Sequence, residues 1–209
     1  MKKILIFILI GLGNYWIWRI FETSLILGLS CIIASVGLSN YLINNKRYLL
    51  ILSSALLVII GLFQIKKFDI RSFTGTSALE RDFIDKRMRL YPSPRVAHWL
   101  EQRPEAIAFY RFTDNSGEVL DFNYYFFANH PRERAAVTEY AKFPWFYLPP
   151  FLGGLYLSLK QKRNLKFHLL FMFAVVVTAA VYPNEPVGFV LVFPFVVSLS
   201  AYSVNNYVK

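Results

Sequence analysis

The amino-acid sequence predicts a mainly α-helical, polytopic membrane bundle of about six spans, with a small α+β domain inserted outside the membrane. Two features of composition favour this class. Of the 209 residues, 56% are hydrophobic and only 17% are charged, whereas a soluble domain carries about 25% charged residues. The apolar residues also lie in blocks, and about 20 helical residues suffice to cross a hydrocarbon core of about 30 Å. A third observation, one central segment too rich in charge to cross, predicts the inserted domain.

Three spans are predicted before the insert, at residues 4–21, 24–43 and 48–65, so that residues 1–67 form the first membrane part. The start of the chain, Lys2-Lys3 followed by apolar residues, is typical of a signal peptide. No small-residue cleavage site follows it, so we expect the segment to be retained as a span or signal anchor. Tyr15, Trp16 and Trp18 favour the membrane–water interface.

Three further spans are predicted after the insert, at residues 144–159, 167–182 and 187–202. The first of these is short, and Pro144, Pro149 and Pro150 are expected to start or kink it. Residues 144–209 therefore form the second membrane part.

The insert, residues 68–143, is predicted to be an α+β unit. Ser77 and Glu80 have the spacing of a capping box, which predicts a helix over residues 78–90. Pro94 suits the first position of a second helix that ends near residue 103. Residues 107–112 and 119–127 are rich in β-forming aromatic side chains, and the turn residues 114–117 between them predict a β-hairpin. A third helix is expected over residues 132–142.

The net charge of +10 is concentrated in short loops and at the termini. No acidic residue accompanies these basic residues, which are Lys2, Lys3, Lys46, Arg47, Lys160, Lys162, Arg163, Lys166 and Lys209. This is the charge pattern of membrane topology rather than of nucleic-acid binding, and nucleic acid is not expected as a partner. The positive-inside rule places both termini in the cytoplasm and residues 68–143 outside it.

The densest polar and aromatic cluster is residues 121–134. Asp121, His130, Arg132 and Glu133 could meet there, at the end of a strand and the N-terminus of a helix. A helix N-terminus attracts anions, and a histidine can transfer protons near neutral pH. The structural alternative is that Asn129 caps the helix while Arg132 and Glu133 form a solvated face.

Metal and cofactor chemistry are not predicted. The single cysteine, Cys31, lies in an apolar block, and three histidines in the whole chain give a weak metal signal. Ionisable residues are nearly missing from the predicted spans, which argues against an ion-coupled transporter.

Residues 123–154, with Tyr124-Tyr125-Phe126-Phe127-Ala128-Asn129-His130-Pro131 and then Lys142-Phe143-Pro144-Trp145, resemble multi-pass bacterial membrane proteins of unassigned activity. Residues 144–156 are also similar to a late span of multispanning glycosyltransferases that use lipid-linked sugars. The acidic motif of the first external loop in such enzymes is not evident here, unless Glu22 takes its place. Neither resemblance implies a mechanism.

Two functions follow as hypotheses. The first is a non-enzymatic membrane protein, embedded in the lipid bilayer, whose extracytoplasmic domain binds a protein partner or ligand, as one subunit of an envelope assembly. The alternative is a membrane enzyme acting on a lipid-linked or headgroup substrate, with Asp121, His130, Arg132 and Glu133 as its catalytic candidates.

Overall fold

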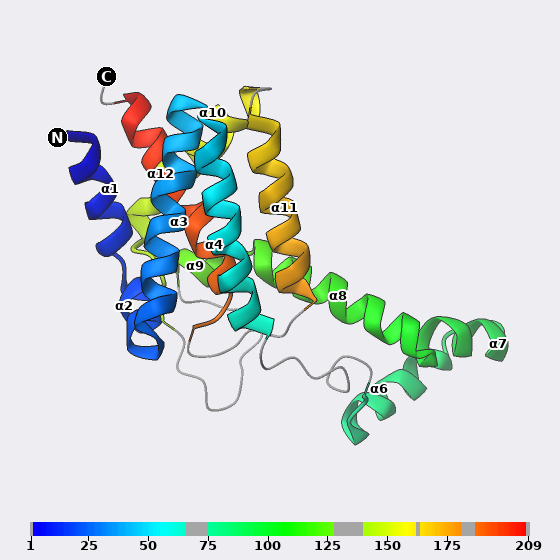
Figure 1. The fold of residues 1–209 in the computed structure, drawn as a ribbon. Helices are drawn as coiled ribbons and strands as arrows, with labels where there is room; N and C mark the ends of the chain where they lie inside the picture. The colour runs from blue at the N-terminus through cyan, green and yellow to red at the C-terminus, as the bar shows by residue number, and fades with distance from the viewer. Residues whose placement is uncertain (1, 66–74, 128–139, 162–163, 181–186, 208–209) are drawn as a thin grey trace.

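The structure is a computed structural model that describes residues 2–65, 75–127, 140–161, 164–180 and 187–207. These residues contain eleven α-helices and no β-strand, which confirms the mainly α-helical class. Seven helices make up the bundle in Figure 1, and they are α1 (Lys2–Leu12), α2 (Tyr15–Thr23), α3 (Leu25–Asn44), α4 (Arg47–Ile65), α10 (Leu148–Lys160), α11 (Leu165–Ala179) and α12 (Phe193–Tyr207). The other elements are α6 (Ala78–Met88), α7 (Pro94–Ala97), the π-helix η1 (His98–Gln102), α8 (Pro104–Leu120), α9 (Phe122–Phe126) and the 3-10 turns η2 (Trp145–Tyr147) and η4 (Val190–Val192).

The prediction of six spans is wrong. Among the described residues, three helical segments are long and apolar enough to cross a membrane: α3, α4 and the continuous stretch of η4 and α12, Val190–Tyr207. Helices α1, α10 and α11 have 11, 13 and 15 residues. At 1.5 Å per residue they are about 17, 20 and 22 Å long, which is shorter than a hydrocarbon core of about 30 Å.

Asn14 explains why the first predicted span is broken. Its side-chain oxygen accepts a hydrogen bond from the Ile17 backbone N–H at 2.9 Å, which caps the start of α2. Its Nδ2 donates to the carbonyls of Ile10 (3.0 Å) and Gly11 (2.9 Å) at the end of α1. One buried amide therefore satisfies the free backbone groups of two helix ends, and the chain turns between them.

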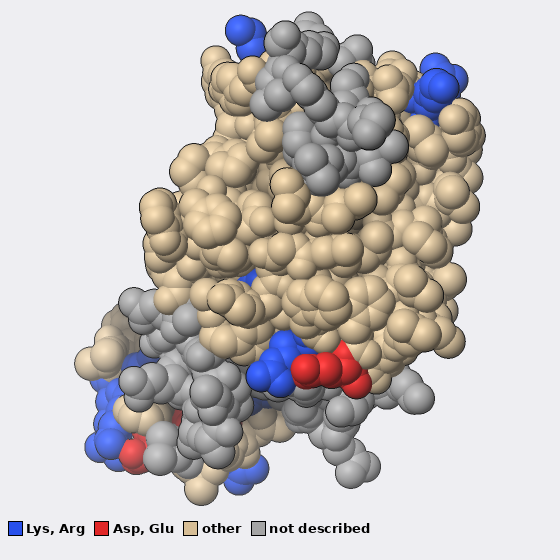
Figure 2. All heavy atoms as spheres, turned by 90° about the vertical axis from the view of Figure 1, so that its left-hand side faces the viewer, with Lys and Arg blue, Asp and Glu red and all other residues tan. Residues whose placement is uncertain are grey.

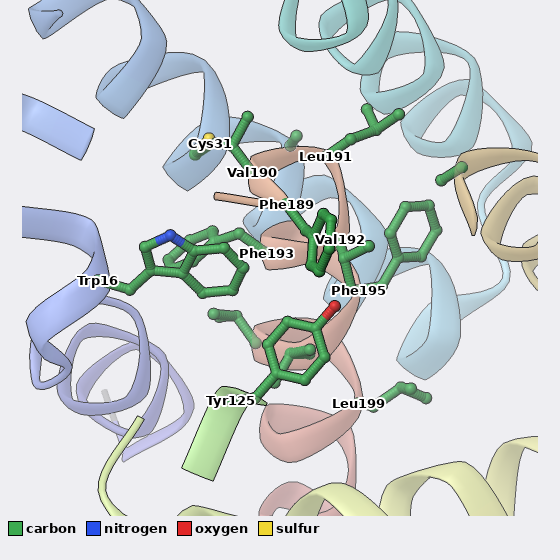
Figure 3. Close-up of a cluster of buried hydrophobic side chains, with 14 of the residues drawn as sticks. Trp16, Cys31, Tyr125, Phe189, Val190, Leu191, Val192, Phe193, Phe195 and Leu199 are labelled. Carbon is green, nitrogen blue, oxygen red and sulfur yellow. The ribbon is translucent and has the colours of Figure 1, made fainter. Parts of the chain in front are cut away.

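The core of the bundle is centred on Trp16, which is fully buried. Figure 3 shows its ring among side chains from α9, η4 and α12. The ring centroid lies 5.6 Å from that of Tyr125 and 5.5 Å from that of Phe193, and Nε1 donates to the Val187 carbonyl at 2.7 Å. Trp16 therefore packs inside the bundle, whereas Trp18 is 56% exposed.

Helix α4 exposes large apolar side chains and buries two polar ones. Its buried residues are Ser53, Leu57, Ile60, Gly61 and Gln64, and Gln64 Oε1 accepts from the Leu191 N–H at 3.1 Å. Beyond its first turn the outward face is apolar, and includes Ile51, Leu52, Val58, Ile59 and Leu62. Such an outward face differs from that of a water-soluble helix, and small or polar residues between helices are typical of bundles in a bilayer.

The predicted β-hairpin is wrong, because residues 107–112 lie within α8 and residues 119–127 span the end of α8 and the whole of α9. The turn residues 114–117 continue the helix, and Asn115 Nδ2 donates to the Ala179 carbonyl of α11 at 3.0 Å. In its described residues the inserted segment therefore contains helices and no strand, rather than an α+β unit. Of the third predicted helix, residues 132–139 lie outside the described residues, and residues 140–142 are not helical.

The two ends of the bundle differ in charge. One end of the bundle contains the start of α1, the turn between α3 and α4, the end of α10, the start of α11 and the end of α12 (Figure 1). Exposed Lys46, Arg47, Lys160 and Lys166 lie in these turns. On the face shown in Figure 2, charged side chains gather towards the two ends and the surface between them is almost entirely uncharged. The uncharged belt has the surface expected of a bilayer-spanning bundle.

Candidate functional site

A helical arm projects sideways from the uncharged bundle, at the end opposite the Lys46–Arg47 turn (Figure 1). We define the arm as residues 75–114, which comprise α6, α7, η1 and the first part of α8. The second part of α8 attaches it to the bundle by packing on α11. Of the arm residues whose burial is described, only Ile84, Ala97 and Glu101 are buried. The arm therefore has very little apolar core of its own.

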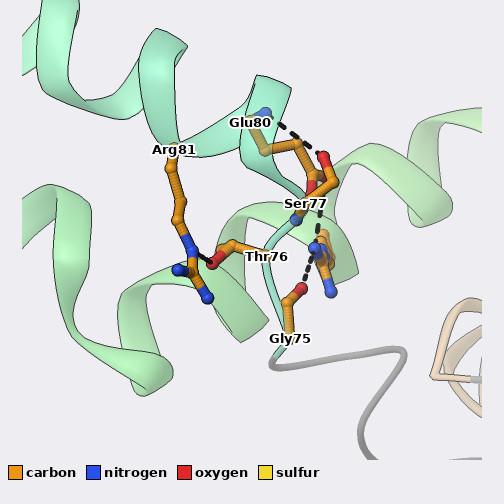
Figure 4. A network of polar contacts seen from close by, with 6 residues as sticks. Gly75, Thr76, Ser77, Glu80 and Arg81 are labelled. Carbon is orange, nitrogen blue, oxygen red and sulfur yellow. Dashed lines mark hydrogen bonds and ion pairs between the residues drawn. The ribbon is translucent and has the colours of Figure 1, made fainter.

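Polar contacts hold the helices of the arm together. The capping box predicted for α6 is confirmed: Ser77 Oγ accepts from the Glu80 N–H at 3.2 Å, and the Ser77 N–H donates to the Glu80 carboxylate at 2.7 Å (Figure 4). Arg111 of α8 donates to the same carboxylate at 3.2 Å and also to the Gly75 carbonyl. The Ser77 N–H and then Arg111 hold the pKa of Glu80 below its ordinary value, because both favour the charged carboxylate.

Glu101 is a buried carboxylate that links η1 to α6. It is 4% exposed, it accepts a hydrogen bond from the Tyr91 hydroxyl at 2.6 Å, and it forms an ion pair with Arg87 at 3.2 Å. The hydrogen bond to Glu101 raises the pKa of Tyr91, because the phenol must keep its proton to donate. Loss of Arg87 would leave the buried Glu101 carboxylate without a charged partner, which is costly, and loss of the Tyr91 hydroxyl would remove one hydrogen bond to it.

A cleft of about 160 Å³ opens between α6, η1 and α8. Its lining combines both signs of charge with apolar side chains, and includes Glu80, Ile84, Arg87, Glu101, Tyr110 and Arg111. The sequence of the whole arm contains seven basic residues and six acidic residues. The cleft is therefore suited to a partner that offers both charges, and less to a simple anion.

Large apolar side chains of the arm lie in contact with solvent. Trp99 is 60% exposed, Phe109 61%, Phe83 56% and Leu90 83%. Of these four residues, Phe83 lines the cleft. Tryptophan, other aromatic residues and arginine are the side chains most enriched where protein surfaces bind one another.

The structure places one of the four predicted site residues. Asp121 lies between α8 and α9, where its carboxylate caps α9 by accepting from the Asn123 N–H at 2.9 Å. It is not part of the cleft lining. His130, Arg132 and Glu133 lie outside the described residues. Among the residues that are described, no group of three or more His, Cys, Asp or Glu side chains is placed to hold a metal ion.

Sequence reasoning missed the residues that build the cleft. Arg87 and Glu101 are fourteen positions apart on two elements, and no spacing rule links such a pair. Lys142 was also missed: it is 4% exposed, and its Nζ lies 3.5 Å from the centroid of the Tyr124 ring. A cation over an aromatic face is favourable, but only the folded chain brings these two residues together.

Comparison with protein-family models, curated proteins and solved structures finds no match for this chain.

Proposed function

We propose that this chain is an integral membrane protein whose arm binds a protein partner at one surface of the bilayer, as one subunit of an envelope assembly. The observation that carries the proposal is the arm itself, which exposes large apolar side chains such as Trp99 and Phe109, contains a charged cleft, and buries only three of the residues whose burial is described. Ordering a chain costs conformational entropy that apolar burial must offset. A partner that covers the arm would supply that burial.

The membrane location rests on the bundle. Three segments have the length and hydropathy of spans, and α4 exposes isoleucine, leucine and valine while it buries Ser53 and Gln64 beside Leu57 and Ile60. In water this packing would leave a large apolar surface exposed. In a bilayer it satisfies both the polar interior and the apolar exterior.

The proposed orientation has the basic end of the bundle in the cytoplasm and the arm on the other side. The turn residues Lys46, Arg47, Lys160 and Lys166 are exposed at the basic end. Short loops rich in lysine and arginine stay on the cytoplasmic side. Lys66, Lys67 and Arg71 carry the opposite signal, but they belong to a segment longer than about 60 residues, and such long loops translocate largely regardless of their charge.

A protein partner suits the arm better than the bilayer surface does. Helices that lie on anionic membranes carry mainly Lys and Arg on their polar face, whereas the arm contains seven basic and six acidic residues. Mixed charge beside exposed aromatic residues matches the rim and core of a protein interface. The enzyme alternative draws no support from the described residues, because Asp121 is engaged as a helix cap.

Site-directed photocrosslinking in intact cells tests the proposal. A photoreactive amino acid at position 99 is expected to give a protein adduct of one discrete mass. The matched control is position 145, because Trp145 is similarly exposed (66%) but lies at η2, outside the arm. Phe109→Ala should reduce the adduct from position 99 several-fold, because interface aromatic residues carry much of the binding energy. Adducts with lipid alone at position 99, or equal protein adducts at both positions, would contradict the proposal.

A further inference from the structure

A groove of about 270 Å³ runs between α1, α3 and α12. It lies in the bundle and shares no residue with the arm. Helix α3 supplies most of one wall, with Ile32, Val36, Ser39, Asn40 and Ile43 at helical spacing along one stripe. The facing wall comes mainly from α1, through Phe7, Ile8, Gly11 and Leu12.

The lining changes in character along the groove. The part nearer the middle of α3 is apolar, and it includes Ile32, Val36 and Leu12. The part nearer the end of α3 carries three amides, Asn40, Asn44 and Asn205, and Asn205 comes from the last turns of α12. Asn40 and Asn205 each use Nδ2 to donate to a carbonyl one turn earlier, at 3.0 and 2.8 Å. Each amide nitrogen has a second hydrogen to offer.

Ser39 gives independent evidence that the groove holds a ligand. Its side chain is 3% exposed and lines the groove. Among the described residues its Oγ has no hydrogen-bond partner, unlike Ser35 one turn earlier, which donates to the Cys31 carbonyl at 2.6 Å. A buried hydroxyl without a partner is costly and calls for an explanation. An occupant with oxygen atoms at this depth would provide the partner.

The charge at the mouth of the groove favours an anion. The amides lie at the basic end of the bundle, where α3 leads directly into Lys46 and Arg47. No Asp or Glu occurs between Glu22 and Asp69, or between Glu139 and Glu185. Basic residues at a membrane surface attract anionic headgroups.

The size of the groove decides between a lipid and a protein helix. One turn of an α-helix is a cylinder about 10 Å wide and 5.4 Å high, which fills about 420 Å³. The groove offers about 270 Å³, so a helix from a second copy of the chain could lie only across its mouth and would not reach Ser39 within it. Part of one flexible hydrocarbon chain is thin enough to enter.

We infer that the groove binds one acyl chain of an anionic phospholipid. The acyl chain lies between Phe7, Ile32 and Val36. The ester region reaches Ser39, and the phosphate lies among the amides near Lys46. This inference rests on the proposed membrane location but not on the proposed partner of the arm.

Native mass spectrometry of the full chain in detergent, with added phosphatidylglycerol or phosphatidylcholine, tests the inference. Wild-type protein should retain phosphatidylglycerol at least fivefold more than phosphatidylcholine. Val36→Trp should reduce the bound phosphatidylglycerol about tenfold, because the larger ring fills the groove. Ile33→Trp is the matched control, since Ile33 lies on the same helix, is 49% exposed and does not line the groove. Equal retention of the two lipids, or equal retention by the two variants, overturns the inference.

A second measurement uses the unaltered chain, so it does not depend on a variant that folds. Phosphatidylglycerol with a photoactivatable acyl chain, in vesicles of phosphatidylcholine, should crosslink to peptides of α1 and α3. Crosslinks confined to the exposed faces of α4 and α11 would show only general solvation by lipid and would overturn the inference. A chain that fails to enter membranes at all would instead refute the proposed location.

Discussion

Gly154 shows how a single residue sets the distance between two helices of the bundle. Its position on α10 faces the backbone of α12, and a Cβ there would overlap the Leu199 carbonyl oxygen. Because the obstacle is backbone rather than a flexible side chain, the helices must move apart to admit it. Small residues allow such close approach in membrane bundles.

We predict that Gly154→Ala destabilises the protein by about 1–3 kcal/mol, the usual cost of overpacking. For a chain of this size, that corresponds to a Tm about 2–10 °C lower, measured on detergent-solubilised protein. Gly117→Ala is the control: the site is helical, and a Cβ there meets nothing within 4 Å. Its Tm should stay the same or rise, because alanine favours a helix over glycine. Equal Tm values for the two variants would show that α10 and α12 do not pack this closely.

Residue-level predictions held where the interaction is local. Ser77 and Glu80 form the predicted capping box, and they are three positions apart. The position of Trp16 could not be predicted, because its hydrogen-bond acceptor, Val187, is 171 positions away. Asp121 was predicted to lie in a strand and to belong to a polar site, whereas it lies between two helices and caps α9. The sequence identifies residues capable of an interaction, but distant partners decide which interaction forms.

At the scale of elements, α8 shows why the β-hairpin prediction failed. Residues 107–112 and 119–127 have high strand propensity, and residues 114–117 have turn chemistry, so each local signal favours a hairpin. The intrinsic preference of a residue for helix or strand is weak, and tertiary packing often overrides it. Asn115 and Val119 are four positions apart and both buried, as one face of a helix requires when it packs on α11.

The element-scale prediction concerns the start of α6. Ser77→Ala removes the side-chain cap and should cost about 1 kcal/mol, which is about a fivefold rise in amide exchange through local opening. Hydrogen exchange followed by mass spectrometry can measure this in peptides from α6. Ser93→Ala is the matched control, because Ser93 precedes α7 but its side chain makes no capping hydrogen bond. If both substitutions changed exchange equally, the capping box would not be what stabilises this helix end.

At the scale of the whole molecule, the two parts of the chain are stabilised in different ways. The bundle buries an apolar core around Trp16 and also buries serines whose hydroxyls bond to backbone, such as Ser198, which donates to the Ser35 carbonyl of α3 at 3.0 Å. The arm relies on ion pairs and caps, which are weak at exposed sites. The bundle is therefore held mainly by apolar burial, and the arm has the least apolar burial to offset the entropy of ordering it.

The proposed orientation predicts opposite accessibility for the two ends of the molecule. Cys31, the single cysteine, is fully buried, so the unaltered chain should give little background with a membrane-impermeant maleimide. Leu90→Cys in the arm, where the native side chain is 83% exposed, should react in intact cells. Lys46→Cys, in the exposed turn between α3 and α4, should react only after the membrane is opened, because the positive-inside rule holds that turn in the cytoplasm. The reversed pattern would place the arm in the cytoplasm, and equal labelling of both sites in intact cells would show that the bundle does not separate two compartments.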